Sequence, residues 1–369
     1  MRIAIDARLI SHSEGGISEY IEQLSSRLPR YDLSNNYLIL QSFRNNNRIT
    51  KNNNAKTIKC FTPPHHKLEK ITLTTEIIAR RINILHSPDF IPPYNGGWKS
   101  VITVHDLAFL LYPQFLTDNS QKYYNNQIHD AVKRSDAILA DSESTRNDIL
   151  NYLNVKPEKV TTIHLAPNDL FTPQSTLKIN RIRKTLNLPD EYILFVGTFE
   201  PRKNIDGLLK AYSNLLSLKK DIPPLVIVGR EGWRHQPIEK IISELHLEHH
   251  TQLIHNANRC HMPSIYSGAT TLVLPSHYEG FGLPVLESMA CGTATIVSNR
   301  GSLPEISEDA SLIIDPDDID SISEAILTIC ENDNLRKNLQ QLGLSQVSKF
   351  TWEKCCQNTI RIYKNLISE

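Results

Sequence analysis

Residues 271–287 read TLVLPSHYEGFGLPVLE, an apolar run followed by a glycine-containing loop and a segment of helical character. The run at 271–275 predicts a buried strand, and Pro284 suits the first turn of a helix. A strand that passes through a short loop into a helix is the repeating unit of α/β proteins. This stretch therefore predicts an α/β fold, and the rest of the chain can be compared with it.

The same alternation extends over the whole chain. Runs rich in Ile, Val and Leu predict strands near 2–6, 37–41, 56–60, 82–86, 101–104, 137–140, 160–164, 192–196, 224–228, 251–254, 271–275, 293–297 and 311–314. Helices are expected near 17–28, 118–134, 143–153, 204–219, 234–246, 283–291, 319–330 and 351–367. Strands that alternate with helices form parallel sheets, so two successive sheets of this kind are expected.

A length of 369 residues suits two domains. The segment 167–175 is rich in Pro, Asn and Ser, which is typical of a linker. We therefore expect an N-terminal domain over 1–171 and a C-terminal domain over 172–350. The last segment, 351–369, is an amphipathic helix that could pack on its own domain or reach back across the linker.

The composition excludes several classes of protein. Lys+Arg and Asp+Glu both number 40, so the chain lacks the basic excess of a nucleic-acid-binding protein. No apolar run approaches the roughly 20 residues that span a bilayer, and the first residues resemble a strand rather than a signal peptide. The six cysteines show no C-x-x-C spacing, which favours buried thiols. We expect a cytoplasmic protein.

The loop after residue 275 is the richest in candidate site residues. Gly280 and Gly282 allow backbone N–H groups to approach an anion at a helix N-terminus, where a diphosphate would fit. Glu287, about one turn into the helix, could reach a ribose, and Glu279 would face the group beyond the phosphates. The eight-residue spacing of these glutamates carries no weight, because chance produces such pairs. The alternative is that Glu279 solvates a loop and Glu287 pairs on a helix face.

Three further loops follow predicted strands. Gly197 to Asn204 contains Arg202 and Lys203, which could neutralise a diphosphate or could be ordinary surface charges. Gly15 and Gly16 lie between the first strand and the first helix, where they could approach a substrate or form a flexible turn. His105 ends a buried strand and would point toward the crevice at the sheet edge, unless its role is structural.

Two other patterns could indicate a metal or a membrane. Asp315-Pro316-Asp317 has the D-x-D form of a metal site, but it precedes a predicted helix, where Asp is expected as a cap. The histidines and the cysteine between 246 and 261 match no compact zinc spacing. Residues 66–82 mix Lys and Arg with Leu and Ile, which fits a basic amphipathic surface for lipid or a core-packed helix.

Taken in order, these features resemble a GT-B glycosyltransferase of family GT4, the retaining group that uses nucleotide-sugar donors. The resemblance covers essentially the whole chain. It rests on Gly15-Gly16, His105-Asp106, Ala140-Asp141-Ser142, Gly197 to Asn204, Glu279 to Glu287, Ala290-Cys291-Gly292 and Gly301 to Glu305.

The resemblance implies two Rossmann-like domains that face a central cleft, with the C-terminal helix crossing back to the N-terminal domain. The N-terminal domain would bind the acceptor and the C-terminal domain the donor. It assigns the diphosphate to Arg202 and Lys203, the ribose to Glu287, the donor sugar to Glu279 and His105, and backbone contacts to Gly16, Phe281, Gly282 and Leu283. The loop at Gly15 and the strand at Gly197 complete the donor site. No metal or other cofactor is expected.

The expected activity is transfer of a hexose from a nucleoside-diphosphate sugar to a sugar hydroxyl with retention. The sequence motifs around Gly197 and His164 resemble those of bacterial polysaccharide and O-antigen mannosyltransferases. This resemblance favours GDP-mannose as the donor, with UDP-glucose next. The acceptor would be a sugar, an oligosaccharide or a lipid-linked glycan, and contact with the membrane surface is an option. Two alternatives stay open: a non-catalytic nucleotide-sugar-binding partner, and a glycoside hydrolase that uses Glu279 and Glu287.

One local departure concerns the donor base. Many relatives carry a glycine after the strand at 251–254, where this chain reads His255-Asn256-Ala257-Asn258.

Overall fold

The computed structural model describes residues 1–11, 15–115, 118–219, 221–232 and 237–368. The chain divides into two compact units. The first contains Met1–Leu107, Asn119–Leu165 and Thr351–Glu369, and the second contains Ala108–Asp118 and Ala166–Phe350. The chain thus changes unit at residue 165, whereas the linker suggested a boundary after 171. The short segment 108–118, which the sequence assigns to the N-terminal domain, clusters with the second unit.

The first unit is built on a parallel sheet of seven strands in the order β3-β2-β1-β4-β5-β6-β7. Its strands are β1 Arg2–Asp6, β2 Asn36–Ser42, β3 Ala55–Cys60, β4 Ile84–Ser87, β5 Lys99–Val104, β6 Ala137–Ala140 and β7 Val160–Thr162. Its helices are α1 Gly16–Tyr31, α2 Glu69–Ile77, α4 Asp118–Arg134, α5 Glu143–Tyr152 and α14 Trp352–Ser368, with 3-10 turns at Arg8–Ser11, Ile78–Arg80 and Pro157–Lys159.

The second unit has a parallel sheet of six strands in the order β10-β9-β8-β11-β12-β13. Its strands are β8 Ile193–Phe199, β9 Leu225–Glu231, β10 Thr251–His255, β11 Thr271–Leu274, β12 Ala294–Ser298 and β13 Ser311–Ile314. Its helices are α3 Ala108–Leu111, α6 Thr176–Leu186, α7 Ile205–Leu218, α8 Ile238–Glu244, α9 Met262–Ser267, α10 Leu283–Ala290, α11 Leu303–Ser307, α12 Ile319–Glu331 and α13 Asp333–Val347. Its 3-10 turns are Pro113–Phe115, Pro201–Lys203, Arg259–His261 and Glu308–Ala310.

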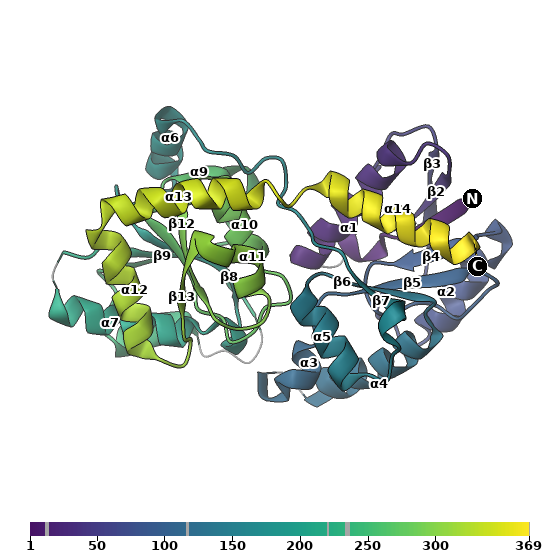
Figure 1. Cartoon of the computed structure of the whole chain (residues 1–369), viewed down its shortest axis with the longest axis horizontal. Coiled ribbons are helices and arrows are strands. Elements are labelled where there is room, and N and C mark those ends of the chain that lie inside the picture. Colours follow the sequence, from purple (N-terminus) through teal and green to yellow (C-terminus); the bar gives the residue numbers. More distant parts are fainter. Residues whose placement is uncertain (12–14, 116–117, 220, 233–236, 369) are drawn as a thin grey trace. The chain divides into compact units, whose positions relative to one another are not determined.

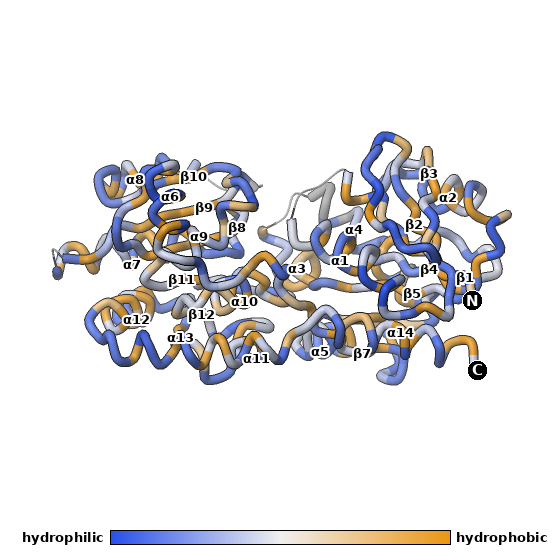
Figure 2. Tube along the Cα trace, turned by 90° about the horizontal axis from the view of Figure 1, so that it is seen from above, coloured by the Kyte–Doolittle hydropathy of each residue, from blue (hydrophilic) through white to orange (hydrophobic). Residues whose placement is uncertain are grey.

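The strands of both sheets form the cores of their units. All four residues of β11 and all five of β12 are buried, because helices cover both faces of a parallel sheet. The helices are amphipathic instead: α12 and α13 alternate between hydrophilic and hydrophobic residues along their length (Figure 2). The strand prediction is confirmed for both sheets, since each expected strand overlaps an observed one.

The terminal helix α14 belongs to the first unit, where it packs against α1 (Figure 1). Trp352 and Tyr363 are buried on the face of α14 that meets this unit. The Tyr363 hydroxyl lies 2.6 Å from Nδ1 of His86, a fully buried residue of β4. The crossing of the last helix back to the N-terminal domain is therefore observed.

Some expectations need correction. The sequence did not predict the helices α6 and α13, and it predicted six buried thiols, although Cys260 is exposed. All six cysteines are free. The predicted helix at 234–246 is shorter in the structure, where α8 covers Ile238–Glu244, and residues 234–236 lie outside the described part. Among the described helices, none has the length and hydrophobicity needed to cross a membrane.

Candidate active site

The order of strands in the second unit indicates where a ligand site should lie. The strand order reverses between β8 and its neighbour β11. In open α/β sheets, ligands bind outside the carboxyl ends of the strands at such a reversal, because the flanking loops separate there. The loop after β8 contains Arg202 and Lys203, and the loop after β11 contains Glu279. The topology therefore brings these two candidate segments together.

Glu279 is the centre of this cluster. Its carboxylate is 2.5 Å from Nζ of Lys203 and 3.3 Å from Nη1 of Arg202, and it accepts a hydrogen bond of 2.7 Å from the Ser276 hydroxyl. Glu279 and Lys203 are 5% and 7% exposed. The two alternatives of a loop-solvating glutamate and of an ordinary surface Arg-Lys pair are therefore wrong for these residues.

A second carboxylate completes the cluster. Glu200 accepts a hydrogen bond of 2.9 Å from Nε of Arg202 and another of 2.8 Å from the hydroxyl of Thr198. The charges of Arg202, Lys203, Glu200 and Glu279 thus cancel. The sequence analysis assigned both cations to a diphosphate without naming a protein partner, and the structure pairs both directly with Glu279 and adds Glu200 as a partner of Arg202.

The ion pairs determine the protonation of Glu279. Burial acts to raise the pKa of this carboxyl, but the nearby charges of Lys203 and Arg202 lower it below its usual value. Glu279 is therefore ionised at neutral pH. Burial also lowers the pKa of Lys203, although Glu279 counteracts the effect. Because both groups are nearly inaccessible to water, removal of either partner would leave a charge buried alone.

The backbone of Glu279 is held by the turn after β12. The amide and hydroxyl of Ser302 donate to the Glu279 carbonyl over 3.1 and 3.0 Å. Gly301 precedes Ser302 with a φ of +58°, and a Cβ atom there would lie 2.6 Å from the Glu279 carbonyl oxygen. A side chain at 301 would therefore displace the loop that carries Glu279. This explains the place of Gly301 in the sequence pattern.

Helix α10 begins directly after this loop, as Pro284 predicted. Gly282 is its N-cap with a φ of +96°, and a Cβ atom there would lie 2.7 Å from Leu303. A positive φ favours glycine, so the close packing and the conformation both require it. Phe281 is buried and packs edge-to-face on Phe350, and Leu283 is the first residue of the helix.

Glu287 lies on α10 and has a different environment from Glu279. It is half-buried, and its Oε2 accepts a hydrogen bond of 2.8 Å from the hydroxyl of Tyr266. The alternative in which Glu287 pairs on a helix face thus has a partner in Tyr266. Contact of Glu287 with a ribose stays a prediction. Gly197 lies in β8, where its backbone is opposite Gly229 of β9 and close to the stem of Lys203.

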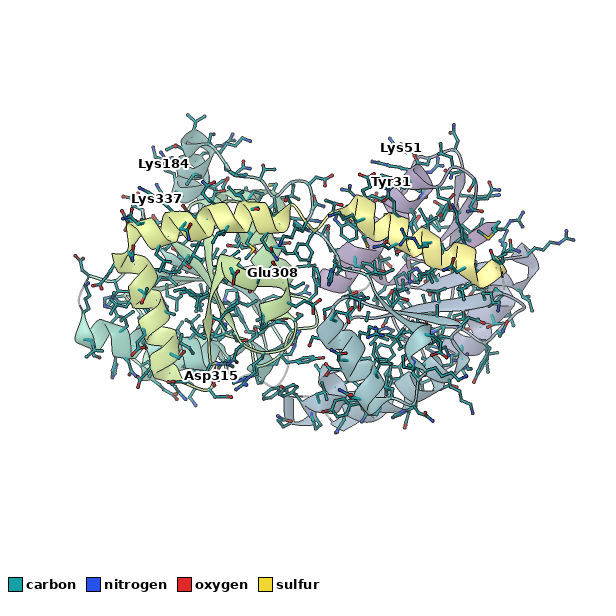
Figure 3. The ribbon with its side chains drawn as sticks, in the orientation of Figure 1. Tyr31, Lys51, Lys184, Glu308, Asp315 and Lys337 are labelled. Carbon is teal, nitrogen blue, oxygen red and sulfur yellow. The ribbon has the colours of Figure 1, made fainter. Side chains whose placement is uncertain are left out.

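The Asp315-Pro316-Asp317 segment, beyond the carboxyl end of β13, has protein partners (Figure 3, where Asp315 is labelled). Arg300 contacts the carboxylates of Asp315 and Asp317, each over 3.0 Å. Asn204 donates to the carbonyl of Pro316 over 2.7 Å, and Asp318 caps α12. Within the described residues, no group of three His, Cys, Asp or Glu side chains is placed to hold a metal ion.

His105 lies in the first unit, after β5. Its Nδ1 is 2.6 Å from Asp141, which follows the neighbouring strand β6, and its Nε2 is 3.0 Å from the carbonyl of Pro88. Since both ring nitrogens face acceptors, the imidazole carries both protons. Burial acts to lower the pKa of His105, but the charge and hydrogen bond of Asp141 raise it to about 9. Ser142, which follows Asp141, is the N-cap of α5.

Gly15 and Gly16 also belong to the first unit. Gly15 is the N-cap of α1, and Gly16 is its first residue. Ser13 and Glu14 of the same loop lie outside the described residues. The structure therefore brings Arg202, Lys203, Glu279 and the start of α10 together in the second unit, and it gathers His105, Gly15 and Gly16 in the first. Each set is described within its own unit.

The loop after β10 shows how this chain replaces a glycine. Asn256 adopts a φ of +53°, a left-handed conformation that Asn tolerates better than other non-glycine residues. Its amide donates to the carbonyl of Gly229 over 2.9 Å. Asn256 thus adopts a left-handed conformation that is also open to glycine.

Comparison with known proteins decides the family. A model described as Glycosyltransferase Family 4 matches residues 15–166, and one described as Glycosyl transferases group 1 matches residues 178–345. The chain is 34% identical over 284 residues to the O-antigen chain mannosyltransferase B of Escherichia coli, covering 77% of this chain and 74% of the relative. This chain belongs to the family 4 glycosyltransferases.

Solved structures agree on the fold. Sucrose-phosphate synthase from Thermosynechococcus elongatus matches with a TM-score of 0.80 at 22% identity, covering 100% of this chain and 99% of that one. HepE of Anabaena, solved in complex with UDP-glucose, matches with a TM-score of 0.75 at 16% identity, covering 100% of both chains. The glycosyltransferase therefore has the GT-B fold that the sequence predicted.

The sequence analysis missed several residues that contact the candidate site residues. Glu200, Ser276 and Tyr266 contact Arg202, Glu279 and Glu287 respectively. Glu200 lies inside a motif already singled out, so a test for charge balance there would have found it. Ser276 and Tyr266 carry no such signal, because an ordinary hydroxyl acquires its role only through the tertiary contact.

Proposed function

We propose that this glycosyltransferase transfers a mannosyl residue from a nucleoside-diphosphate sugar to a sugar hydroxyl, with retention at the anomeric carbon. The observation that carries the proposal is the 34% identity to an O-antigen chain mannosyltransferase over 77% of the chain. GDP-mannose is the favoured donor and UDP-glucose the next. The product would be a polysaccharide, an O-antigen or a glycolipid.

The buried charge cluster supports a role in stabilising the leaving diphosphate. Arg202 and Lys203 provide two cations at one loop, and α10 begins at Leu283, four residues after Glu279. As the sugar–phosphate bond breaks, negative charge grows on the diphosphate, and fixed cations and backbone N–H groups stabilise it. In this proposal Glu279 orients both cations and accepts hydrogen bonds from the donor sugar, while Glu287 binds the ribose and Gly16 borders the diphosphate.

The favoured chemical step is attack by the acceptor hydroxyl on the face of the sugar that the diphosphate leaves. The bond between the anomeric carbon and the acceptor oxygen forms, the bond to the phosphate oxygen breaks, and the acceptor proton passes to the leaving phosphate. His105, which carries both protons, would stabilise charge near the donor sugar. No residue needs to act as a covalent nucleophile, and no metal is required, because the cations of the cluster supply the counter-charge.

The hydrolase alternative is disfavoured by the state of Glu279. A glycoside hydrolase needs one carboxylic acid that is protonated at working pH, so its pKa must be raised. The pKa of Glu279 is instead lowered by Lys203 and Arg202, although burial opposes the shift. A carboxylate in this environment is suited to accepting hydrogen bonds and pairing with cations, and not to donating a proton.

Contact with a membrane surface is part of the proposal for a lipid-linked acceptor, which would place the enzyme on the cytoplasmic side of the membrane. Helix α2 buries Leu73 and Ile77 in the core, while Leu68 and Ile71 are 55% and 53% exposed. Lys67 precedes them and is exposed too. Apolar side chains beside a cation are typical of a surface that meets anionic lipid. A vesicle-binding assay with and without anionic lipid tests this part separately.

The activity is tested by a donor panel followed by a transfer assay. GDP-mannose should raise the melting temperature with concentration more than UDP-glucose does, because a ligand that binds only the folded state stabilises it by mass action. Release of nucleoside diphosphate should then require an acceptor glycan, and NMR of the product should show the anomeric configuration of the donor.

Each part of the proposal can fail by itself. A larger shift with UDP-glucose would change the donor, and an inverted product would refute retention. Donor binding without turnover over a broad acceptor panel would favour the non-catalytic alternative. Release of sugar from a simple glycoside without nucleotide would favour hydrolysis. Loss of activity with a chelator, restored by a divalent cation, would refute the metal-free mechanism.

A further inference from the structure

A buried tyrosine of the second unit contacts one of the candidate site residues. Tyr266 lies on the short helix α9 and is 0% exposed. Its hydroxyl donates a hydrogen bond of 2.8 Å to Oε2 of Glu287, which lies on α10. The proposed function uses Glu287 to bind the ribose of the donor but gives Tyr266 no role. The contact between the two side chains therefore needs an explanation of its own.

The surroundings of the Tyr266 ring are apolar and do not require a hydroxyl. The ring belongs to a core cluster of the second unit that also contains Leu194 and Leu272, and Phe171 meets it edge-to-face with 5.7 Å between the ring centroids. A phenylalanine would fill the same space and bury no polar atom. Because a buried hydroxyl costs free energy unless it is hydrogen-bonded, the hydroxyl of Tyr266 is explained by its partner Glu287.

The backbone of Tyr266 is fixed as well. Its carbonyl accepts hydrogen bonds of 2.6 Å from the hydroxyl of Thr293 and of 3.0 Å from the amide of Ala269. Close packing keeps a core side chain in one rotamer, so the phenol hydroxyl is a rigid donor. A glutamate side chain has several rotamers of its own, and a rigid donor at one carboxylate oxygen restricts them. Tyr266 thus determines how the carboxylate of Glu287 is oriented.

The hydrogen bond between these side chains is charge-assisted. Burial and the negative charge of Glu287 both raise the pKa of the Tyr266 hydroxyl well above its ordinary value, so the hydroxyl keeps its proton and donates it. Hydrogen bonds to an ionised group are stronger than those between neutral groups. A carboxylate can accept about four hydrogen bonds, of which Tyr266 supplies one. This bond therefore orients the carboxylate and does not by itself saturate it.

We propose that Tyr266 is a positioning residue for Glu287, and that it thereby sets the preference of the donor site for a nucleotide that carries both ribose hydroxyls. The neighbouring hydroxyls of a ribose donate to a carboxylate, and a carboxylate that is ordered in advance loses less entropy when they bind. The inference rests on the proposed function, in which Glu287 binds the ribose, and it adds the residue that makes this contact selective.

The experiment compares two nucleotides that differ only in the ribose hydroxyls. Calorimetry of the full chain measures the binding of GDP and of dideoxy-GDP, which lacks both hydroxyls. UDP and dideoxy-UDP are measured in parallel, and the pair that binds more tightly is used. The result is the ratio of the two dissociation constants, called here the ribose preference. A general loss of packing weakens both nucleotides alike and leaves this ratio unchanged, whereas loss of a positioned carboxylate lowers it.

The test variant is Tyr266→Phe, and Tyr192→Phe is the matched control. Tyr192 is 1% exposed and belongs to the same core cluster, and its hydroxyl donates over 2.6 Å to the carbonyl of Ile265. Each substitution removes one buried hydrogen bond from this core, so similar falls in melting temperature are expected. Both variants should fold, because phenylalanine fills the space of the tyrosine ring. A third variant, Glu287→Ala, reports on the carboxylate itself.

We expect the wild type to show a ribose preference of roughly 30-fold, because hydrogen bonds to a charged group contribute strongly when they are buried. Tyr266→Phe should lower this preference about three- to tenfold, and Tyr192→Phe should keep the wild-type value. Glu287→Ala should abolish most of the preference. In the transfer assay, Tyr266→Phe should raise the KM of the donor more than it lowers kcat, because the ribose contact is made before the chemical step.

The outcomes separate the inference from the proposed function. An unchanged ribose preference in Tyr266→Phe, together with its loss in Glu287→Ala, would overturn the inference and leave the proposed function intact. Equal falls in Tyr266→Phe and Tyr192→Phe would also overturn it, since the effect would then come from the core. An unchanged preference in Glu287→Ala would refute the ribose contact in the proposed function, and the inference with it.

Discussion

The two units place charged side chains at the same topological position but combine them differently. In the first unit, Arg8 is held by Asp6 and Glu69, and a third carboxylate, Asp89, pairs with His65. In the second unit, Arg202 and Lys203 are matched by Glu200 and Glu279. The partners of the carboxylates are therefore an arginine and a histidine at one reversal of strand order, and an arginine and a lysine at the other.

The difference lies in how the cations are held. Arg8 is 1% exposed and is committed to two carboxylates, whereas Arg202 and Lys203 follow one another in a single loop and share Glu279. The local pairing of charges, rather than the sheet, distinguishes the two positions, and the following variants test that comparison.

The largest effect is expected for Glu279→Gln in the balanced cluster. It leaves Lys203 buried without its closest counter-charge, so the free energy of unfolding should fall by about 3 kcal/mol. The cations would also lose their orientation, and kcat/KM should fall by about 100- to 1000-fold. Chemical denaturation and initial rates measure the two effects.

The control is Glu331→Gln, which breaks the exposed pair of Glu331 with Lys219. An exposed pair contributes at most about 1 kcal/mol, so this variant should resemble the wild type. Wild-type stability and rate in Glu279→Gln would contradict the role given to the cluster.

The second effect is expected for Arg8→Met in the charge cluster of the first unit. Asp6 and Glu69 would then face one another without a cation, and the free energy of unfolding should fall by about 3 kcal/mol. Lys349→Met, which breaks the exposed pair of Lys349 with Glu308, should cost less than about 1 kcal/mol. Urea denaturation of both variants checks the prediction, and similar losses for the two would show that the buried network is not specially stabilising.

The smallest effect concerns the pH dependence of the first unit. Burial acts to lower the pKa of His105, but Asp141 raises it to about 9, above the value of roughly 6.5 in an unfolded chain. The protonated form is thus stabilised by folding. This stability is complete below about pH 6.5 and is lost as the pH rises through about 9.

Urea titration measures the difference in free energy of unfolding between wild type and His105→Gln. This difference should therefore decrease by on the order of 2 kcal/mol between about pH 6 and pH 10. His277→Gln is the control in the second unit, because the pKa of His277 is lowered by burial despite the opposing charge of Asp317. The difference in free energy of unfolding between wild type and His277→Gln should show no such decrease as the pH rises. A constant difference for His105→Gln would refute the ionised pair with Asp141.

Much of the architecture follows from local patterns. The strands near 2–6 and 271–275 and the helix that starts at Pro284 were predictable, because burial on both sheet faces requires apolar runs and proline suits a first helical turn. Helix α13 was not predicted, since its sequence is polar over most of its length and its order depends on packing against α10. The same applies to α6, which has no fully buried residue.

The site divides in the same way. The sequence by itself determined that Arg202, Lys203 and Glu279 follow strands, because loop positions follow from the alternation of strands and helices, whereas only the structure made those two strands neighbours. It could not determine that Glu279 pairs with both cations or that Glu200 balances them. These properties depend on distances of a few ångströms, for Glu279 between segments far apart in the chain, and burial then fixes their energies. Only the tertiary structure decided which charges are compensated and which residues compensate them.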